Sequence, residues 1–171
     1  TSEAYRPCLF SFYRTLLMRS CSSYNRRIPV KKYKLIANPA AGRGKAGAVL
    51  REVTELLRAR GADFDWELTT GPGQAAEIAR SSLDKAEVIV AVGGDGTVNE
   101  ILPALLHTGK PLGVIPAGSG NDFIKALHIP NDIGQATDIL FTGNTAVIDV
   151  GRINDAFFAN GVGVGFDAAV N

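Results

Sequence analysis

The sequence predicts an α/β fold built on a mostly parallel sheet. From Tyr33 onward, short runs rich in β-branched and aromatic residues alternate with stretches of helical periodicity. The run Glu87–Val92 is almost entirely apolar, which is typical of a strand buried on both faces of a parallel sheet. Strands that alternate with helices in this way form βαβ units with right-handed crossovers.

Each predicted element has a local signal. The helix over Lys45–Arg60 places Val49, Val53, Leu56 and Leu57 on one face, and Gly61 ends it. The helix over Pro72–Leu83 has its proline near the first turn. The other predicted helices are Thr97–Leu106, Asp122–Leu127 and Ile133–Phe141, and the other predicted strands are Tyr33–Ala37, Phe64–Leu68, Leu112–Ile115, Ala146–Val150 and Ala156–Ala159.

The charge distribution divides the chain into unlike parts. The 171 residues are 46% hydrophobic and 20% charged, and their net charge of +1 excludes a uniformly basic nucleic-acid binder. Residues 1–34 carry a net charge of +7, whereas residues 35–171 carry −6. We predict a basic leader at 1–31, disordered or non-native, an α/β domain at 32–150, and the start of a second, truncated domain at 151–171.

Two other interpretations of the leader stay open, an organelle-targeting peptide and a basic patch attracted to anionic lipid. The two cysteines, Cys8 and Cys21, both lie in the leader, so no disulfide framework is expected and a reducing compartment is the default. No run approaches the roughly 18 apolar residues needed to span a bilayer. Because the stretch 157–171 has the composition of structured chain, we expect the natural protein to continue.

A glycine-rich turn follows the first predicted strand at Asn38-Pro39-Ala40-Ala41-Gly42-Arg43-Gly44-Lys45-Ala46-Gly47. Its Gly-x-Gly-x-x-Gly spacing matches a dinucleotide fingerprint, with acidic residues about twenty positions on. Bare amides at a helix N-terminus with Arg43 and Lys45 nearby suit a phosphate. The alternative is a tight strand-to-helix turn with solvated charges.

A second turn, Gly93-Gly94-Asp95-Gly96-Thr97-Val98-Asn99-Glu100, follows the buried strand directly. Its glycines permit close approach of a ligand to the backbone. Asp95 is interpreted either as the N-cap of the next helix or as a carboxylate that holds a cation such as Mg²⁺ beside bound phosphate.

The third turn, Pro116-Ala117-Gly118-Ser119-Gly120-Asn121-Asp122, supplies Ser119, Asn121 and Asp122 as hydrogen-bonding groups around a nucleotide, with capping as the competing role for Asp122. Asp149 interrupts a predicted apolar strand, where an acid is costly unless it is paired or bound to metal. Asp95, Asp122 and Asp149 are therefore predicted to converge on one cation. For Asp149 the alternative is an edge-strand acid that points to water.

These three turns, in this order and spacing, resemble the diacylglycerol kinase catalytic-domain family in its bacterial lipid-kinase branch. The resemblance covers about Lys32 to Asn171. It implies a three-layer N-terminal domain like that of phosphofructokinases and NAD kinases, followed by a C-terminal β-sandwich, with ATP and lipid meeting between them. It also implies an ATP-dependent lipid kinase that is cytoplasmic and peripheral to the membrane.

The resemblance further implies roles for individual residues. Asp95 is the expected catalytic residue, and Asp95, Asp122 and Asp149 would form a water-linked Mg²⁺ network. Asp167 would lie near the hydroxyl of the lipid substrate. The expected ATP-binding residues are Asn38, Pro39, Ala40, Ala41, Gly42, Thr69, Gly93, Gly94, Asp95, Gly96, Thr97, Val98, Asn99, Glu100 and Ser119.

The chain departs from the family in one respect. The family's general base lies in an Asp-Gly-Glu motif of the second domain, and the sequence contains no such motif. We therefore expect this chain by itself to be inactive. Expected partners are ATP and a lipid alcohol but no nucleic acid, and a homodimer is kept open. The alternative functions are an NAD kinase-like enzyme and a Rossmann-type NAD-binding domain.

Overall fold

A computed structural model describes residues 10–14, 32–143 and 145–159. Its centre is a four-stranded sheet in the order β3-β2-β4-β5, in which every neighbouring pair is parallel. These strands are β2 (Lys32–Ala37), β3 (Asp63–Leu68), β4 (Val88–Gly93) and β5 (Leu112–Pro116). The predicted α/β fold with a mostly parallel sheet is confirmed.

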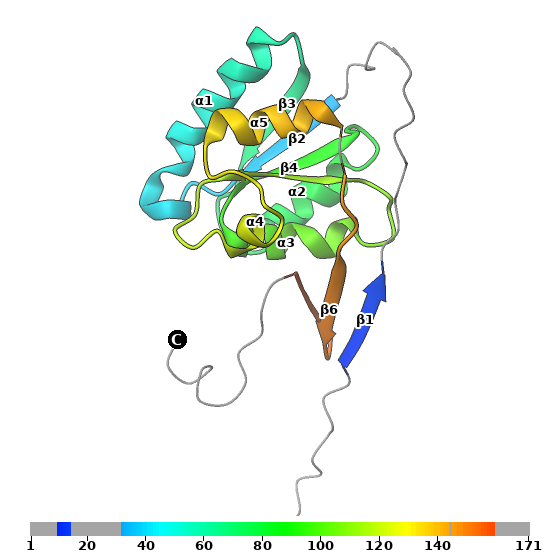
Figure 1. Ribbon diagram of the computed structural model, residues 1–171. Coiled ribbons are helices and arrows are strands. Elements are labelled where there is room, and N and C mark those ends of the chain that lie inside the picture. Colours follow the sequence, from blue (N-terminus) through cyan, green and yellow to red (C-terminus); the bar gives the residue numbers. More distant parts are fainter. Residues whose placement is uncertain (1–9, 15–31, 144, 160–171) are drawn as a thin grey trace, which may run out of the picture.

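Helices cover both faces of this sheet (Figure 1). One face carries α1 (Ala46–Ala59) and α5 (Ile133–Thr142), and the other carries α2 (Gln74–Ser82), α3 (Asp95–Leu105) and α4 (Asp122–Ala126). The short 3₁₀ helix η1 (Ala41–Gly44) joins β2 to α1 and was not predicted. The layers are therefore helix, sheet and helix, as the alternation of elements requires.

The position of strand β4 between two helical layers explains why its sequence is apolar throughout. Val88, Val90 and Val92 pack in the core under α1 and α5, whereas Ile89 and Ala91 pack in the core under α2, α3 and α4. All six residues of the strand are buried. Because successive side chains of a strand point to opposite faces, only a continuous apolar run fills both cores.

A second, antiparallel sheet has the order β1-β6-β7. It consists of β1 (Phe10–Arg14), β6 (Asp149–Ile153) and β7 (Ala156–Phe158). The structure thus forms a strand from five residues of the leader that was predicted to be disordered or non-native. The predicted domain boundary at residue 150 falls within β6, and the other domain boundaries stay predictions.

The predicted strand Ala146–Val150 is wrong at its start. The strand begins at Asp149, and residues 146–148 have no regular secondary structure. The reason is that Ile148 packs against the core beneath α3 and α4 instead of joining a sheet. Among the described residues, no helix has the length and apolar character needed to cross a membrane.

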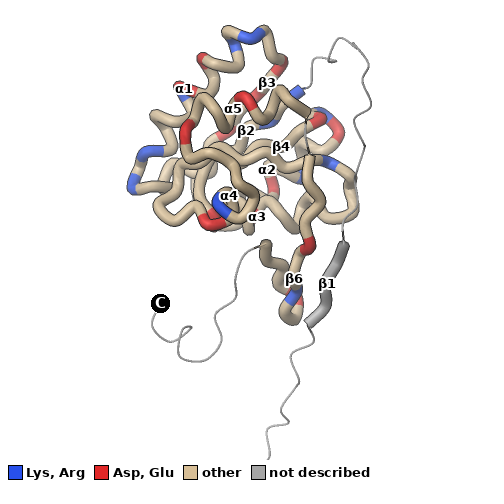
Figure 2. Tube along the Cα trace, in the orientation of Figure 1, with Lys and Arg blue, Asp and Glu red and all other residues tan. Residues whose placement is uncertain are grey.

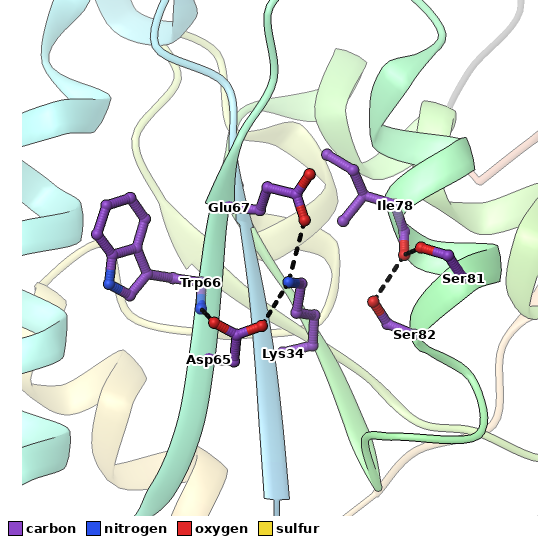
Figure 3. Close-up of polar contacts among 7 residues, drawn as sticks. All are labelled: Lys34, Asp65, Trp66, Glu67, Ile78, Ser81 and Ser82. Atoms are coloured by element: carbon purple, nitrogen blue, oxygen red, sulfur yellow. Dashed lines mark hydrogen bonds and ion pairs between the residues drawn. The ribbon is translucent and has the colours of Figure 1, made fainter.

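Lys34 is a buried cation on β2, the strand that lies next to the edge strand β3 (Figure 3). Its ammonium group donates to the carboxylates of Asp65 at 2.7 Å and Glu67 at 3.1 Å, both on the edge strand β3. The side chain of Lys34 is only 10% exposed, whereas those of Asp65 and Glu67 are 66% and 50% exposed. The two acids therefore neutralise a charge that the fold has withdrawn from water.

The same contacts shift two pKa values. Burial alone would lower the pKa of Lys34, but its hydrogen bonds with Asp65 and Glu67 outweigh burial and raise that pKa. The hydrogen bond from Lys34 lowers the pKa of Asp65 below its usual 3.8. The stabilisation from Asp65 is thus complete above its unfolded-state pKa and is lost as the pH falls through the lowered folded-state value.

Removing the acids is expected to cost more than removing the lysine. The double variant Asp65→Asn/Glu67→Gln leaves a buried ammonium without a counter-charge and should lose about 2 kcal/mol of unfolding free energy, whereas Lys34→Met leaves exposed acids that water solvates and should change it by less than about 1 kcal/mol. Urea denaturation measures both values. The deficit of the double variant should shrink as the pH falls below 3.8. Equal losses in the two variants would contradict this account of the cluster.

Candidate functional site

The carboxyl ends of the four parallel strands lie at one edge of the sheet, and the loops that leave them meet there. Backbone hydrogen bonds join the beginnings of these loops to neighbouring strands. The amide of Asn38 donates to the carbonyl of Val92 at 3.3 Å, and that of Ala117 donates to Gly93 at 2.9 Å. The amide of Thr69 donates to Ala37 at 2.9 Å. The structure therefore brings together all the loops that the sequence proposed for ATP.

The first loop is shaped by a pair of left-handed residues. Gly42 and Arg43 have φ angles of 59° and 58° within η1. A Cβ on Gly42 would overlap the carbonyl oxygen of Ala117, so this position needs glycine for a close contact with the third loop. Figure 2 shows basic residues at the start of α1, and Arg43 and Lys45 are both exposed there. The first loop thus places positively charged side chains near the carboxyl ends of the parallel strands.

The second and third loops pack against each other through glycines. A Cβ on Gly94 would lie 2.9 Å from the Cα of Gly118, and a Cβ on Gly118 would overlap Gly94 in return. A Cβ on Gly93 would overlap the buried side chain of Thr97. Packing therefore accounts for Gly93 and Gly94, two of the three glycines of the second turn that the sequence assigned to ligand approach. Gly96 is different, because nothing lies within 4 Å of its Cβ position.

Asp95 connects these two loops. It lies in the first turn of α3, where Gly94 occupies the N-cap position, so it does not cap its own helix. Its Oδ1 accepts a hydrogen bond from the amide of Phe123 at 2.8 Å, and its Oδ2 accepts one from the amide of Asp122 at 3.1 Å. Asp95 thus caps α4, which begins 27 residues later in the sequence.

Two carboxylates lie close to Gly120. The Cβ position of Gly120 lies 3.3 Å from Oδ2 of Asp95 and 3.6 Å from Oδ2 of Asp122. Asp122 is exposed and its other carboxylate oxygen pairs with Lys125 at 2.9 Å. Carboxylate oxygens suit Mg²⁺, which usually keeps several waters and takes one or two protein carboxylates. The carboxylates of Asp95 and Asp122 are therefore of the kind and number that a partly hydrated Mg²⁺ ion takes.

Asp149 does not complete a direct ligand set. It is exposed at the first position of β6. Within residues 32–143 and 145–159, no three His, Cys, Asp or Glu side chains are grouped so that they can hold a metal ion. The water-linked network of Asp95, Asp122 and Asp149 stays a prediction, and Asp167 lies outside the described residues.

Several other predicted site residues have structural partners. The side chains of Thr97 and Val98 are buried in the core, so these residues can offer a ligand only their backbone. The side-chain oxygen of Asn99 accepts a hydrogen bond from the amide of Ala159 at 3.2 Å, which fastens β7 to α3. Ser119 is exposed on the third loop, and Glu100 is half-buried.

Asn121 has a structural role that the sequence did not reveal. It adopts the left-handed conformation with a φ of 54°, and it is 7% exposed. Its side chain accepts from the amide of Gly118 at 3.1 Å and donates to the carbonyl of Gly118 and to Asn131, each at 3.0 Å. The side chain of Asn121 therefore fixes the conformation of the third loop by bonding to both backbone groups of Gly118. The only sequence signal was a short polar residue directly before a helix.

Comparison with known proteins identifies the family of this arrangement. A sequence model of the diacylglycerol kinase catalytic domain matches residues 32–153, which is more than half of the chain. The chain belongs to the diacylglycerol kinase catalytic-domain family. This membership sets aside the Rossmann-type interpretation of the first loop.

Relatives in this family come from several bacteria. The chain is 36% identical over 135 residues to a diacylglycerol kinase of Staphylococcus aureus strain RF122, covering 76% of this chain and 42% of the relative. It is 35% identical over 133 residues to that of Staphylococcus carnosus, covering 76% and 44%. A diacylglycerol kinase structure from Bacillus anthracis superposes with a TM-score of 0.68 at 31% identity, covering 77% of this chain and 47% of that one. The chain thus spans less than half the length of these relatives.

A methyl group on Gly118 is expected to separate the loops of this family domain. Gly118→Ala must push against the backbone of Gly94, so it should lower the unfolding free energy by about 1–3 kcal/mol. The matched control is Gly96→Ala, which faces open space within α3 and should be neutral or stabilising by about 0.5–1 kcal/mol. Thermal denaturation of both variants measures the difference. A Gly118→Ala protein as stable as the wild type would refute the close packing of the two loops.

Proposed function

We propose that this chain forms the ATP-binding part of a kinase that transfers the γ-phosphoryl group of ATP to the hydroxyl of a lipid such as diacylglycerol. The observation that carries the proposal is that the carboxylates of Asp95 and Asp122 both lie close to Gly120, among the glycine-rich loops that follow the carboxyl ends of the parallel strands. Ligands of open α/β sheets bind at this edge. Family membership and relatives named diacylglycerol kinase support the reaction class.

The first loop is the proposed cradle for the phosphates. Exposed Arg43 and Lys45 lie beside it and complement the negative charge of a triphosphate. Phosphoryl transfer depends largely on positioning and on neutralisation of the charge on the transferred group. A rigid loop braced by Gly42 and Ala117 supplies the positioning, and the two basic side chains supply part of the charge.

Mg²⁺, when bound, would offset the negative charge of the phosphates. Asp95 and Asp122 are the residues of this chain proposed to hold it, with Asp149 acting through water. Because Asp95 also accepts two amide hydrogen bonds from α4, its carboxylate is fixed in orientation before a cation arrives. Such preorganisation lowers the cost of binding.

The transfer forms a bond between the lipid oxygen and the γ-phosphorus and breaks the bond from that phosphorus to the bridging oxygen, which leaves with ADP. The hydroxyl proton passes to a general base that we expect in a second domain. Asp167 is proposed to lie near the lipid hydroxyl. The enzyme would work at the surface of a membrane, where its lipid substrate resides.

Asp95→Asn is expected to weaken binding of Mg-ATP by about tenfold or more, because a charge-assisted contact worth roughly 1.5–3 kcal/mol is lost. The matched control is Asp132→Asn, since Asp132 also accepts an amide at the start of a helix, from Gln135 at 2.8 Å, but on α5. Isothermal titration calorimetry with Mg-ATP measures both variants, and the control should bind as the wild type does.

Titration of the wild-type chain with NAD tests the alternative functions. NAD binding without a response to Mg-ATP would contradict the kinase proposal. In the intact enzyme, Asp95→Asn should also slow phosphoryl transfer by at least about 100-fold while the protein remains folded. Turnover near the wild-type rate would remove Asp95 from the proposed site.

A further inference from the structure

The hairpin formed by β6 and β7 is tied to the helical layer of the parallel sheet by a side chain of α3. Its two strands pair antiparallel and extend away from the parallel sheet (Figure 1). Directly after β7, Ala159 packs against the core beneath α3 and α4, and its amide donates to the side-chain oxygen of Asn99 at 3.2 Å. This bond joins residues that are 60 positions apart in the sequence. It holds the end of the hairpin against the second turn of α3.

Asn99 lies one helical turn after Asp95 on the same helix. Residues four apart lie on the same face of an α-helix and are displaced by about 6 Å along its axis. Asp95 accepts two amides at the start of α4. Asn99 in turn accepts the amide of Ala159. Two neighbouring side chains on one face of α3 therefore fix two segments that are distant from it in the sequence.

The contact with Ala159 changes the interpretation of Asn99. The sequence placed Asn99 among the expected ATP-binding residues, in the second glycine-rich turn. In the structure its side chain is half-buried, and its oxygen is bonded to an amide of the protein itself. The side chain of Asn99 therefore joins two parts of the chain, and its oxygen already has a donor in place of a nucleotide hydroxyl.

The place of Ala159 matters because the chain continues from it toward Asp167, which is proposed to lie near the lipid hydroxyl. A segment of about eight residues spans at most ~28 Å when it is fully extended. An anchor at Ala159 limits the region that such a segment can reach, and it centres that region on α3 one turn beyond Asp95. Phosphoryl transfer depends on positioning, and a misplacement of about 1 Å can cost about 100-fold in rate.

We propose that Asn99 is a positioning residue for phosphoryl transfer. Its bond to Ala159 fixes the end of the β6–β7 hairpin relative to Asp95, and with it the start of the segment that follows. The proposal rests on the proposed function, which supplies the reaction and its need for groups outside this domain. Asn99 touches neither the nucleotide nor the lipid and acts through β7 and the following segment. A hydrogen bond that served stability alone would not change the rate of transfer in the folded enzyme.

The first test measures the contact on this chain by amide hydrogen exchange. Asn99→Ala removes the acceptor and suits a helix, so the amide of Ala159 should exchange about 3- to 10-fold faster than in the wild type. Asn99→Asp is the matched control, because it keeps an acceptor oxygen at the same position and should retain protection to within about twofold. Equal exchange in the wild type and in Asn99→Ala would overturn the proposed anchor.

Calorimetric titration with Mg-ATP separates positioning from direct contact with the nucleotide. Because the proposal leaves the nucleotide site intact, Asn99→Ala should bind Mg-ATP with an affinity within about twofold of the wild type, whereas loss of a hydrogen bond to the nucleotide would cost more. A larger loss of affinity would show that Asn99 contacts the nucleotide and would overturn the proposal.

Enzyme kinetics test the positioning role itself. In the intact enzyme, Asn99→Ala should lower kcat by about 10- to 100-fold with an unchanged KM for ATP, and Asn99→Asp should recover most of the lost rate. Unfolding free energies of the same proteins show whether they remain folded under the assay conditions. An unchanged kcat in Asn99→Ala would overturn the proposal, and so would a loss that Asn99→Asp does not recover. If the wild-type enzyme phosphorylates no lipid, the proposed function fails, whereas the exchange measurement still decides whether Asn99 anchors β7.

Discussion

The contact between the second and third loops is the constraint on which the candidate site depends. Gly94 and Gly118 approach so closely that neither has room for a side chain, and Asp95 fastens the start of α4 with both of its carboxylate oxygens. Without this contact, the two strands β4 and β5 would still pair, but the loops beyond them would have no fixed relation. The close packing of these glycines therefore holds the loops after β4 and β5 together, and the carboxylates of Asp95 and Asp122 both lie close to Gly120.

The parallel sheet could be predicted because local patterns and tertiary burial agree. The apolar run of β4 can be satisfied only between two helical layers, and the amphipathic helix α1 supplies one of them. The prediction of a strand start failed where apolar residues pack against the core without joining a sheet. The apolar sequence of residues 146–148 is typical of a strand. In the structure these residues instead line an apolar pocket next to α3 and β5, and only the tertiary structure distinguishes a strand from such a packing segment.

The sequence predicted which loops form the candidate site, but it did not predict the contacts between them. Glycines after strands mark the edge where ligands bind, so the three loops were recognisable. The partners of Asp95 and Asn121 were not, because they depend on how segments distant in the sequence meet. Asp95 accepts hydrogen bonds from amides 27 and 28 residues away, and the side chain of Asn121 donates to that of Asn131, ten residues away. A sequence pattern shows that a polar residue needs a partner, but it does not show which one.

The two roles of Asp95 bear on how its substitution is interpreted. Asp95 caps α4 and is also proposed to lie at a phosphate site, so its substitution would affect both the stability of α4 and the charge of that proposed site. Asparagine keeps one acceptor oxygen and replaces the other with a donor, which would face an amide that also donates. Loss of activity on substitution therefore combines a lost charge with a displaced α4. Because the backbone of Phe123 is held by the same carboxylate, such a displacement also reaches the buried side chain of Phe123 in the core.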